Sequence, residues 1–365
     1  MSSESNTSDL TSTWHTNLEA AICEHCDWSY LVPAGSLPVH CPHCFQAWLT
    51  PISAQAVNLL YSQPPELILP FTLSADTLAQ SIQTFAGHIW FAPDDLKPQN
   101  LQARLQRVYL PMWLVDSEVQ ATWQAEVGFN YEVVSHQDRY NDHRGGWVSQ
   151  KVTETRIRWE PRLGRLTRTY HNTVAPALEE HRHLQQQLGA YNLKDSQAYQ
   201  AQTIADAFIR LPNRLPTDAW PDAIPPIQAT AAEECRRAGS ADHVRQFRWQ
   251  ADYPTLNWTL LLLPMVVTYY LDDDKKPQPI LIHGQSGRLS GPRRASMKRA
   301  QRMALIIVGV AVAVFTLSVG LGIVSIFAPR VLVLAIIALA VAIIIGLLAI
   351  APIVIAWQFN RSTNG

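Results

Sequence analysis

The sequence predicts an α+β protein, in which a small cysteine-containing unit is followed by a β-rich mixed domain and by two apolar helices. Three observations lead to this prediction: two Cys-x2-Cys pairs near the N-terminus, alternating apolar and polar residues in the middle, and two long uncharged stretches near the C-terminus. Because 47% of the 365 residues are hydrophobic, a wholly disordered chain is excluded. Residues 1–18 are expected to form a disordered tail, since they are rich in Ser and Thr and lack the apolar core of a signal peptide.

The two cysteine pairs predict a metal site. Cys23 and Cys26 form the first pair, and Cys41 and Cys44 form the second after a gap of 14 residues. Two such pairs can converge on one tetrahedral ion, which is typical of a zinc ribbon, here over 19–52. Four protein ligands leave no position for water, so the zinc is expected to be structural. Redox thiols or a disulfide are the alternative, and the two histidines inside the pairs are alternative ligands: His25 and His43.

A β-rich mixed domain is expected over 58–291. Apolar and polar side chains alternate over 118–127, as in a strand with one buried face. The same alternation over 153–160, a turn at 163–164 and a strand over 165–170 predict a hairpin. Two more strands are expected, the second of them central because it is continuously apolar: 247–253 and 258–271.

Helical segments are expected between these strands. Ser74 can cap a helix that carries apolar residues on one face. A helical insertion is expected over 175–238, with prolines breaking the chain before its last helix. The three helices expected within the insertion are 176–188, 196–209 and 227–238.

The C-terminal end predicts a transmembrane hairpin over 303–357. Met303 to Phe327 gives 25 residues without charge, and Val331 to Trp357 gives 27 more. Each stretch exceeds the roughly 20 apolar residues that span a bilayer as a helix. The alternative, a pair of buried core helices, is disfavoured by the length of both uncharged runs. Neither stretch contains an ionisable residue, which argues against an ion pathway and for an anchor.

A basic collar over 292–302 precedes the hairpin and predicts its orientation. Lys and Arg accumulate on cytoplasmic flanks, so both termini are expected in the cytoplasm of a two-pass inner-membrane protein, with a short tail over 358–365. Without residues 303–365 the chain has 27 basic and 30 acidic residues, so the near-neutral total conceals an acidic cytoplasmic part. Setting this topology is the favoured role of the collar, and additional binding to anionic lipid headgroups is the alternative. The basic residues at this membrane surface are Arg288, Arg293, Arg294, Lys298, Arg299 and Arg302.

Small residues recur at helical spacing in the second apolar stretch. They predict close helix packing, either within the hairpin or between copies in a homo-oligomer. The residues of this stripe are Ala335, Ala338, Ala342, Gly346 and Ala349.

Two further motifs give the chain a resemblance to known proteins. The strand Val108-Tyr109-Leu110-Pro111-Met112-Trp113-Leu114 and the turn Gly284-Gln285-Ser286-Gly287-Arg288 accompany the cysteine pairs and the spans. This combination resembles bacterial zinc-ribbon membrane proteins, which are often labelled as relatives of the primosomal replication helicase or as transcription-factor-type zinc ribbons. The resemblance implies a partnership with membrane-stress systems of the phage-shock type. The helicase label itself has no support here, because the chain lacks a phosphate-binding G-x-x-x-x-G-K-[ST] loop.

Three functional classes follow from these features. A membrane-anchored scaffold with a protein partner is favoured, because the anchor and the structural metal come without a catalytic motif. A membrane-tethered nucleic-acid-binding or regulatory protein is the alternative, but residues 21–51 contain no Lys or Arg to neutralise phosphates. An enzyme is not expected, since the histidines are scattered and the acidic run 272–274 is typical of a solvated turn.

Overall fold

The computed structural model describes residues 10, 12–52, 63–87, 89–141 and 146–362, and the chain folds as two compact units. One unit, called unit 1, contains residues up to 111, 180–211 and 262 onwards. The other, unit 2, contains 112–179 and 212–261. The prediction of an α+β fold with four clustered cysteines near the N-terminus and two apolar C-terminal helices is confirmed.

The sheet of unit 1 extends from the cysteine-containing strands to the last strands of the chain. β1 (Leu18–Cys23) pairs with β3 (Leu49–Pro51) and with β2 (Ser29–Pro33), all antiparallel. β2 then pairs with β8 (Phe208–Arg210), and β8 runs parallel to the first residues of β5 (Gln106–Asn141). Consequently the cysteine-containing strands belong to the main sheet of unit 1. The other strands of this sheet are the end of β9 (His243–Leu271), β10 (Pro277–His283), β11 (Leu289–Ser290), β4 (Leu67–Ile68) and β7 (Gln197–Ala198).

The core beside β1 and β2 includes residues that precede the first strand. Leu10 is buried, Trp14 is only 1% exposed, and both pack with Leu18 and Tyr109 in one cluster. The Tyr199 hydroxyl donates to the Trp14 carbonyl at 2.9 Å. The expectation of a disordered tail over 1–18 is therefore wrong for residues 10 and 12–18, because an indole and two leucines gain more from burial than a Ser/Thr-rich composition suggests. Residues 1–9 and 11 lie outside the described part.

The helical insertion differs from the expectation. α4 (His181–Leu188) occupies only the second half of the helix expected over 176–188. Residues 196–209 form β7, a 3-10 turn over Ala201–Ile204 and β8 instead of a helix. The apolar residues Phe208 and Ile209 pair with β5 and β2, so tertiary pairing outweighs local helix propensity.

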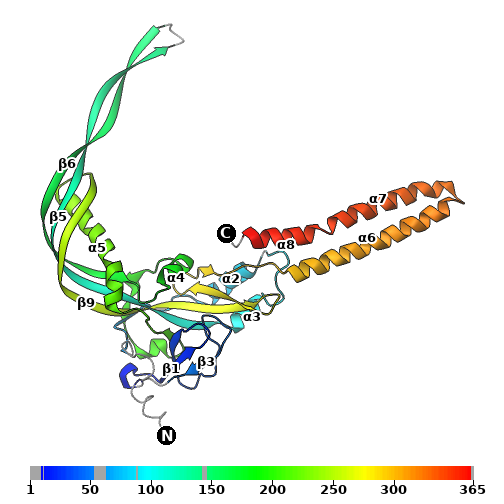
Figure 1. Cartoon of the computed structure of the whole chain (residues 1–365), viewed down its shortest axis with the longest axis horizontal. Helices are drawn as coiled ribbons and strands as arrows, with labels where there is room; N and C mark the ends of the chain where they lie inside the picture. Colours follow the sequence, from blue (N-terminus) through cyan, green and yellow to red (C-terminus); the bar gives the residue numbers. More distant parts are fainter. Residues whose placement is uncertain (1–9, 11, 53–62, 88, 142–145, 363–365) are drawn as a thin grey trace. The chain divides into compact units, whose positions relative to one another are not determined.

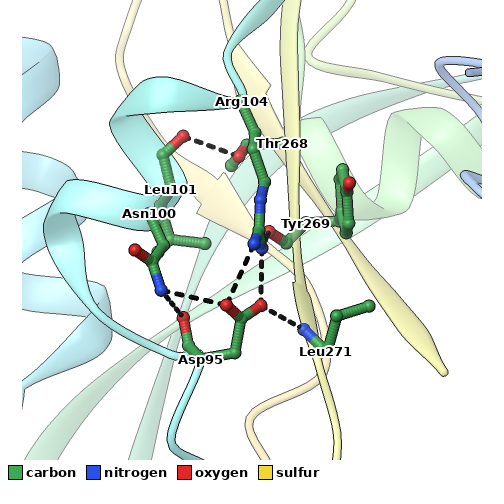
Figure 2. Close-up of polar contacts among 7 residues, drawn as sticks. All are labelled: Asp95, Asn100, Leu101, Arg104, Thr268, Tyr269 and Leu271. Atoms are coloured by element: carbon green, nitrogen blue, oxygen red, sulfur yellow. Dashed lines mark hydrogen bonds and ion pairs between the residues drawn. The ribbon is translucent and has the colours of Figure 1, made fainter. Parts of the chain in front are cut away.

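Helices α2 (Ala75–Ala86) and α3 (Pro98–Ala103) also belong to unit 1. Ser74 caps α2 as predicted, since its side chain accepts from the Thr77 N–H at 3.1 Å. α3 is tied to the end of β9 through Asp95 (Figure 2). The Asp95 carboxylate accepts from Arg104 at 2.5 and 3.0 Å and from the Leu271 N–H at 2.7 Å. Asn100 adds a fourth hydrogen bond to this carboxylate at 2.9 Å.

Asp95→Asn is expected to lower the free energy of unfolding of unit 1 by about 2 kcal/mol at pH 7, since hydrogen bonds to charged groups are worth about 1.5–3 kcal/mol. Burial raises the pKa of Asp95, but the hydrogen bonds from Arg104 and the Leu271 N–H outweigh it, so the pKa lies below its ordinary value. This contribution is fully present above the unfolded pKa of about 3.9 and is lost as the pH falls through the folded pKa.

Denaturant unfolding in detergent measures this effect. The difference between Asp95→Asn and the natural protein should shrink between pH 7 and about pH 2.5, below the ordinary pKa. Asp206→Asn is the matched control, because Asp206 is 66% exposed and its ion pair with Arg107 lies at the surface. An undiminished difference at low pH would contradict the assigned role of Asp95.

Unit 2 is built on two unusually long antiparallel strands. β5 continues to Asn141, and β6 (Gly146–Ala175) pairs with it from Ala175 to Gly146, which gives the long two-stranded ribbon in Figure 1. The turn expected at 163–164 is wrong, because β6 passes straight through Leu163 and Gly164. A Cβ at Gly164 would lie 3.1 Å from the Trp123 ring, so this glycine permits a close approach instead of a turn.

Helix α5 (Pro216–Ala238) packs against β6 and begins 11 residues before the helix expected there. Pro216 occupies the first turn, where its missing N–H costs little. Its three interior prolines are all exposed, so water can replace the lost backbone partner. The buried side is formed at four-residue spacing by Ala219, Ala223, Ile227, Ala231 and Cys235, and its burial offsets the proline cost.

The C-terminal helices of unit 1 form an antiparallel hairpin. α6 (Met297–Ser325) packs along α7 (Leu332–Leu348), and α8 (Ala351–Ser362) continues α7 after a break at 349–350 (Figure 1). Both arms are long and apolar enough to cross a membrane, and only 17% of the most apolar stretch of each is buried. The remaining apolar side chains face outward, as they do in helices that contact lipid.

Small residues at seven-residue spacing line the inside of this hairpin. Ala304, Ala311 and Ser318 are buried on α6, and the Ser318 hydroxyl donates to the Ala335 carbonyl at 2.9 Å. Of the predicted stripe, Ala335, Ala342 and Ala349 are buried, whereas Ala338 and Gly346 are half-buried. The stripe therefore packs within the hairpin, one of the two uses that the sequence allows.

At the base of the hairpin its two ends contact each other and residue Phe91 of unit 1. The Asn360 side chain accepts from the Ala295 N–H at 2.7 Å and donates to the Ala295 carbonyl at 3.0 Å. Ala300 and Ala356 are fully buried here, with Phe91 and Phe359 against them. The expected tail over 358–365 is thus helical through Ser362, and residues 363–365 lie outside the described part.

Candidate metal centre

The two cysteine pairs adopt the same backbone conformation. In the first, the Asp27 N–H donates to the Cys23 carbonyl at 2.8 Å, and in the second the Phe45 N–H donates to the Cys41 carbonyl at 3.0 Å. Asp27 and Phe45 each have positive φ, +57° and +53°, directly after the second cysteine of the pair. This turn directs both thiols of a pair to the same side. The turn after β1 and the turn over 41–45 are therefore equivalent.

The four thiols converge on one point. Cys23 Sγ lies 3.6 Å from Cys44 Sγ, and Cys26 Sγ lies 3.7 Å from Cys41 Sγ. All four sulfur atoms lie within 4.8 Å of one another. A tetrahedral site with metal–sulfur bonds of about 2.3 Å has sulfur atoms about 3.8 Å apart. The four predicted ligand residues are thus close enough to hold a metal ion.

The environment of the thiols also suits metal binding. Cys23 and Cys41 are buried, while Cys26 and Cys44 are half-buried. The hydrogen bond between Cys26 and Cys41 lowers the pKa of the Cys41 thiol to about 5, and burial raises the pKa of the Cys23 thiol. The His43 N–H lies 3.4 Å from Cys41 Sγ and supports a thiolate there. A metal ion would supply the positive charge that keeps all four groups deprotonated.

The histidines of the pairs do not join the thiols. Among the described residues, the group able to hold a metal consists of the four cysteines alone. His43 stacks on Trp28 with ring centroids 3.7 Å apart and an interplanar angle of 6°, and burial lowers its pKa. His25 is exposed. The remaining cysteine, Cys235, is buried in α5 of unit 2.

One buried cation close to this centre was not anticipated from the sequence. Arg210, on β8, is 3% exposed, pairs with Tyr30 of β2 and holds its guanidinium carbon 4.7 Å from the Trp28 ring centre. Burial lowers its pKa. The only signal in the sequence is one arginine within the otherwise apolar run 207–211. Because this run is far from the cysteines along the chain, the sequence does not indicate that Arg210 lies near them.

Acidic residues elsewhere in unit 1 neutralise part of the basic collar. Lys298 pairs with Asp274 at 3.1 Å, and Arg299 pairs with Asp94. Arg293 donates to the Gly87 carbonyl at 2.8 Å and lies over the Phe85 ring. The predicted lipid-contacting set therefore narrows to the exposed arginines that have no carboxylate partner among the described residues: Arg288, Arg294 and Arg302.

Replacing Arg294 and Arg302 together by Gln is expected to weaken the preference for anionic over neutral lipid by about 2 kcal/mol, at about 1 kcal/mol for each basic residue near the surface. Lys298→Gln with Arg299→Gln is the matched control and should change it much less, because those charges are already paired. Lipid enrichment around the full chain in nanodiscs of mixed phosphatidylcholine and phosphatidylglycerol measures both. Equal losses for the two pairs would refute this division of the collar.

The motif Gly284-Gln285-Ser286-Gly287 has a structural explanation. A Cβ at Gly284 would lie 2.4 Å from the Pro264 carbonyl oxygen, and Gly287 has a φ of +70°. The Gln285 side chain exchanges two hydrogen bonds with the Asn192 backbone, at 2.9 and 3.2 Å. The motif thus fixes the turn between β10 and β11 against residue 192.

The described residues also line two open grooves, neither of which has the residues of a catalytic site. One of about 470 Å³ lies on unit 2 beside Trp123, Arg165 and Arg248, and another of about 410 Å³ lies between α2 and β11. Neither places a nucleophile next to a general base. Comparisons with protein-family models, with curated proteins and with solved structures give no match for this chain.

Proposed function

We propose that this chain is a non-enzymatic scaffold that is anchored in the inner membrane and presents a protein-binding surface in the cytoplasm. The observation that carries the proposal is the attachment of the apolar hairpin to a sheet that also contains the four-cysteine cluster. The Ser296 N–H donates to the Phe91 carbonyl at 2.7 Å, and Phe91 packs against the buried alanines at the hairpin base, so the hairpin contacts the folded part of unit 1. Such a contact suits a protein whose task is to hold a partner at the bilayer.

The metal in this proposal is zinc in a structural role. Four thiolates in tetrahedral spacing favour zinc or iron over oxygen-preferring cations, and zinc is the usual ion of such ribbons. Four protein ligands leave no open position for substrate. One zinc per purified chain, measured together with iron by mass spectrometry, supports this assignment, whereas a colourless metal-free protein with intact thiols argues against it.

The orientation in this proposal rests on the collar. Six basic residues lie just before α6 or in its first two turns, whereas only Arg330 lies in the connection between the arms. The positive-inside rule then places units 1 and 2 on the cytoplasmic side. In intact cells a membrane-impermeant thiol reagent added from outside should label Ala328→Cys, because this proposal places the connection between the arms on the external side of the membrane. Labelling of that cysteine from the cytoplasmic side would contradict the topology.

The partner belongs, in this proposal, to a membrane-stress response of the phage-shock type, as the family resemblance implies. Photo-crosslinking from exposed positions of units 1 and 2, in the full chain and in its native membrane, tests this step. Crosslinks to one peripheral membrane protein that increase under membrane stress would support the scaffold. A chain that forms no crosslink under either condition would contradict it.

A further inference from the structure

Arg210 presents a buried charge without a local counter-charge. Its side chain donates from Nη1 to the Ser29 carbonyl at 3.1 Å and to the Leu211 carbonyl at 2.9 Å, while its Nε has no partner among the described residues. No carboxylate of the described residues lies within ion-pair distance of it. Glu180 interacts with it only at longer range, and one Glu180 carboxylate oxygen is itself buried without a partner.

A guanidinium remains protonated in proteins, so burial of Arg210 requires compensation. Two carbonyl oxygens and an indole face provide part of it. A fully buried charge without an opposite charge is nevertheless expensive. The fold retains Arg210 at this place, which indicates that negative charge is available nearby in the functional state.

The cysteine cluster is the source of such charge. With a divalent ion, four thiolates carry a net charge of −2. Arg210 interacts electrostatically with Cys26 and Cys41, and its neighbour Trp28 stacks on His43 of the second cysteine pair. β8 is held beside β2 by the pairing of Arg210 with Tyr30. The cation and the thiol cluster are therefore held together by the sheet.

We infer that Arg210 is the counter-cation of the metal–thiolate centre, so that metal affinity depends on a residue 166 positions beyond Cys44. This inference rests on the proposed metal site. The charge of Arg210 lowers the energy of the dianionic loaded centre, whereas the cluster offsets less of this charge without the ion that holds all four thiols deprotonated. Arg210 thus stabilises the loaded form more than the metal-free form.

Zinc affinity of the full chain in detergent, measured by competition with a chromophoric chelator, tests the inference. Arg210→Met should weaken zinc binding by about 10- to 100-fold, the range typical of residues just outside a metal's ligands. Arg210→Lys keeps the charge and should retain most of the affinity. Arg107→Met is the matched control, because Arg107 is 55% exposed and pairs with Asp206 at the surface. The cobalt-loaded variant should keep the tetrahedral tetrathiolate spectrum, which shows that the ligands are unchanged.

Thermal unfolding without metal supplies a second readout. Arg210→Met should lower the unfolding midpoint of the zinc-loaded protein more than that of the metal-free protein. A variant that binds zinc like the natural protein, or that loses as much stability without metal as with it, would overturn the inference. If the natural chain binds no stoichiometric zinc, the proposed metal site itself fails, so the two failures are distinguishable.

Discussion

Cys41→Ser is expected to abolish stoichiometric zinc binding and to destabilise unit 1 well beyond the cysteine loops. Structural zinc sites contribute about 10–16 kcal/mol of apparent binding free energy, so their loss exceeds the net stability of many small domains. β1 and β2 share the core cluster of Trp14, Tyr109 and Ile209. Unfolding of the ribbon therefore exposes the edge of the main sheet of unit 1.

Metal content by mass spectrometry and thermal unfolding in detergent measure the two effects. At about 2–4 °C for each kcal/mol in a unit of this size, the unfolding midpoint should fall by more than about 10 °C. Cys235→Ser is the matched control, because Cys235 is a buried thiol of unit 2 and does not belong to the cluster. It should retain zinc. A Cys41→Ser protein that still holds one tightly bound zinc would refute the four-thiolate site.

The sequence was informative where short spacing determines geometry. The two Cys-x2-Cys motifs identify all four candidate metal ligands. In each motif the two cysteines are only three positions apart, so the local turn alone brings their thiols together. Ser74 was identified as a helix cap for the same reason, since its partner is the N–H of Thr77. Two uncharged stretches identified the hairpin, because the hydrocarbon thickness fixes the required length.

Features that depend on distant partners were missed. Gly164 predicts a turn locally, but the Trp123 ring across the ribbon determines that β6 continues. Prolines 221, 225 and 226 predict a break, yet the buried side of α5 keeps the helix intact. Arg210 lies over the Trp28 ring, two residues after Cys26, only because β8 pairs with β2. In each of these cases the deciding contact joins residues that are far apart in sequence.

A pair of arginines in the middle of the hairpin is expected to prevent stable membrane integration. Val312 on α6 and Ile344 on α7 are exposed, and they lie at nearly equal distances from the connecting turn, so both sit at the same depth in a bilayer. Arginine at the centre of a spanning helix costs about 2.5–3.5 kcal/mol for each residue in membrane insertion. Together the two changes cost about 5–7 kcal/mol, which is enough to shift the chain away from the inserted state.

Extraction of membranes with alkaline carbonate measures this outcome. Val312→Arg with Ile344→Arg should leave the membrane pellet or be degraded, while Val312→Ala with Ile344→Ala, the matched control, should remain. Two soluble core helices would respond differently, because these side chains face outward and a charge there would meet water at little cost. The natural chain is therefore the reference for this experiment. If the natural chain resists carbonate extraction, a double-arginine protein that is folded, soluble and zinc-bound is compatible with an anchor. A natural chain that is already soluble would show that the hairpin does not span the bilayer.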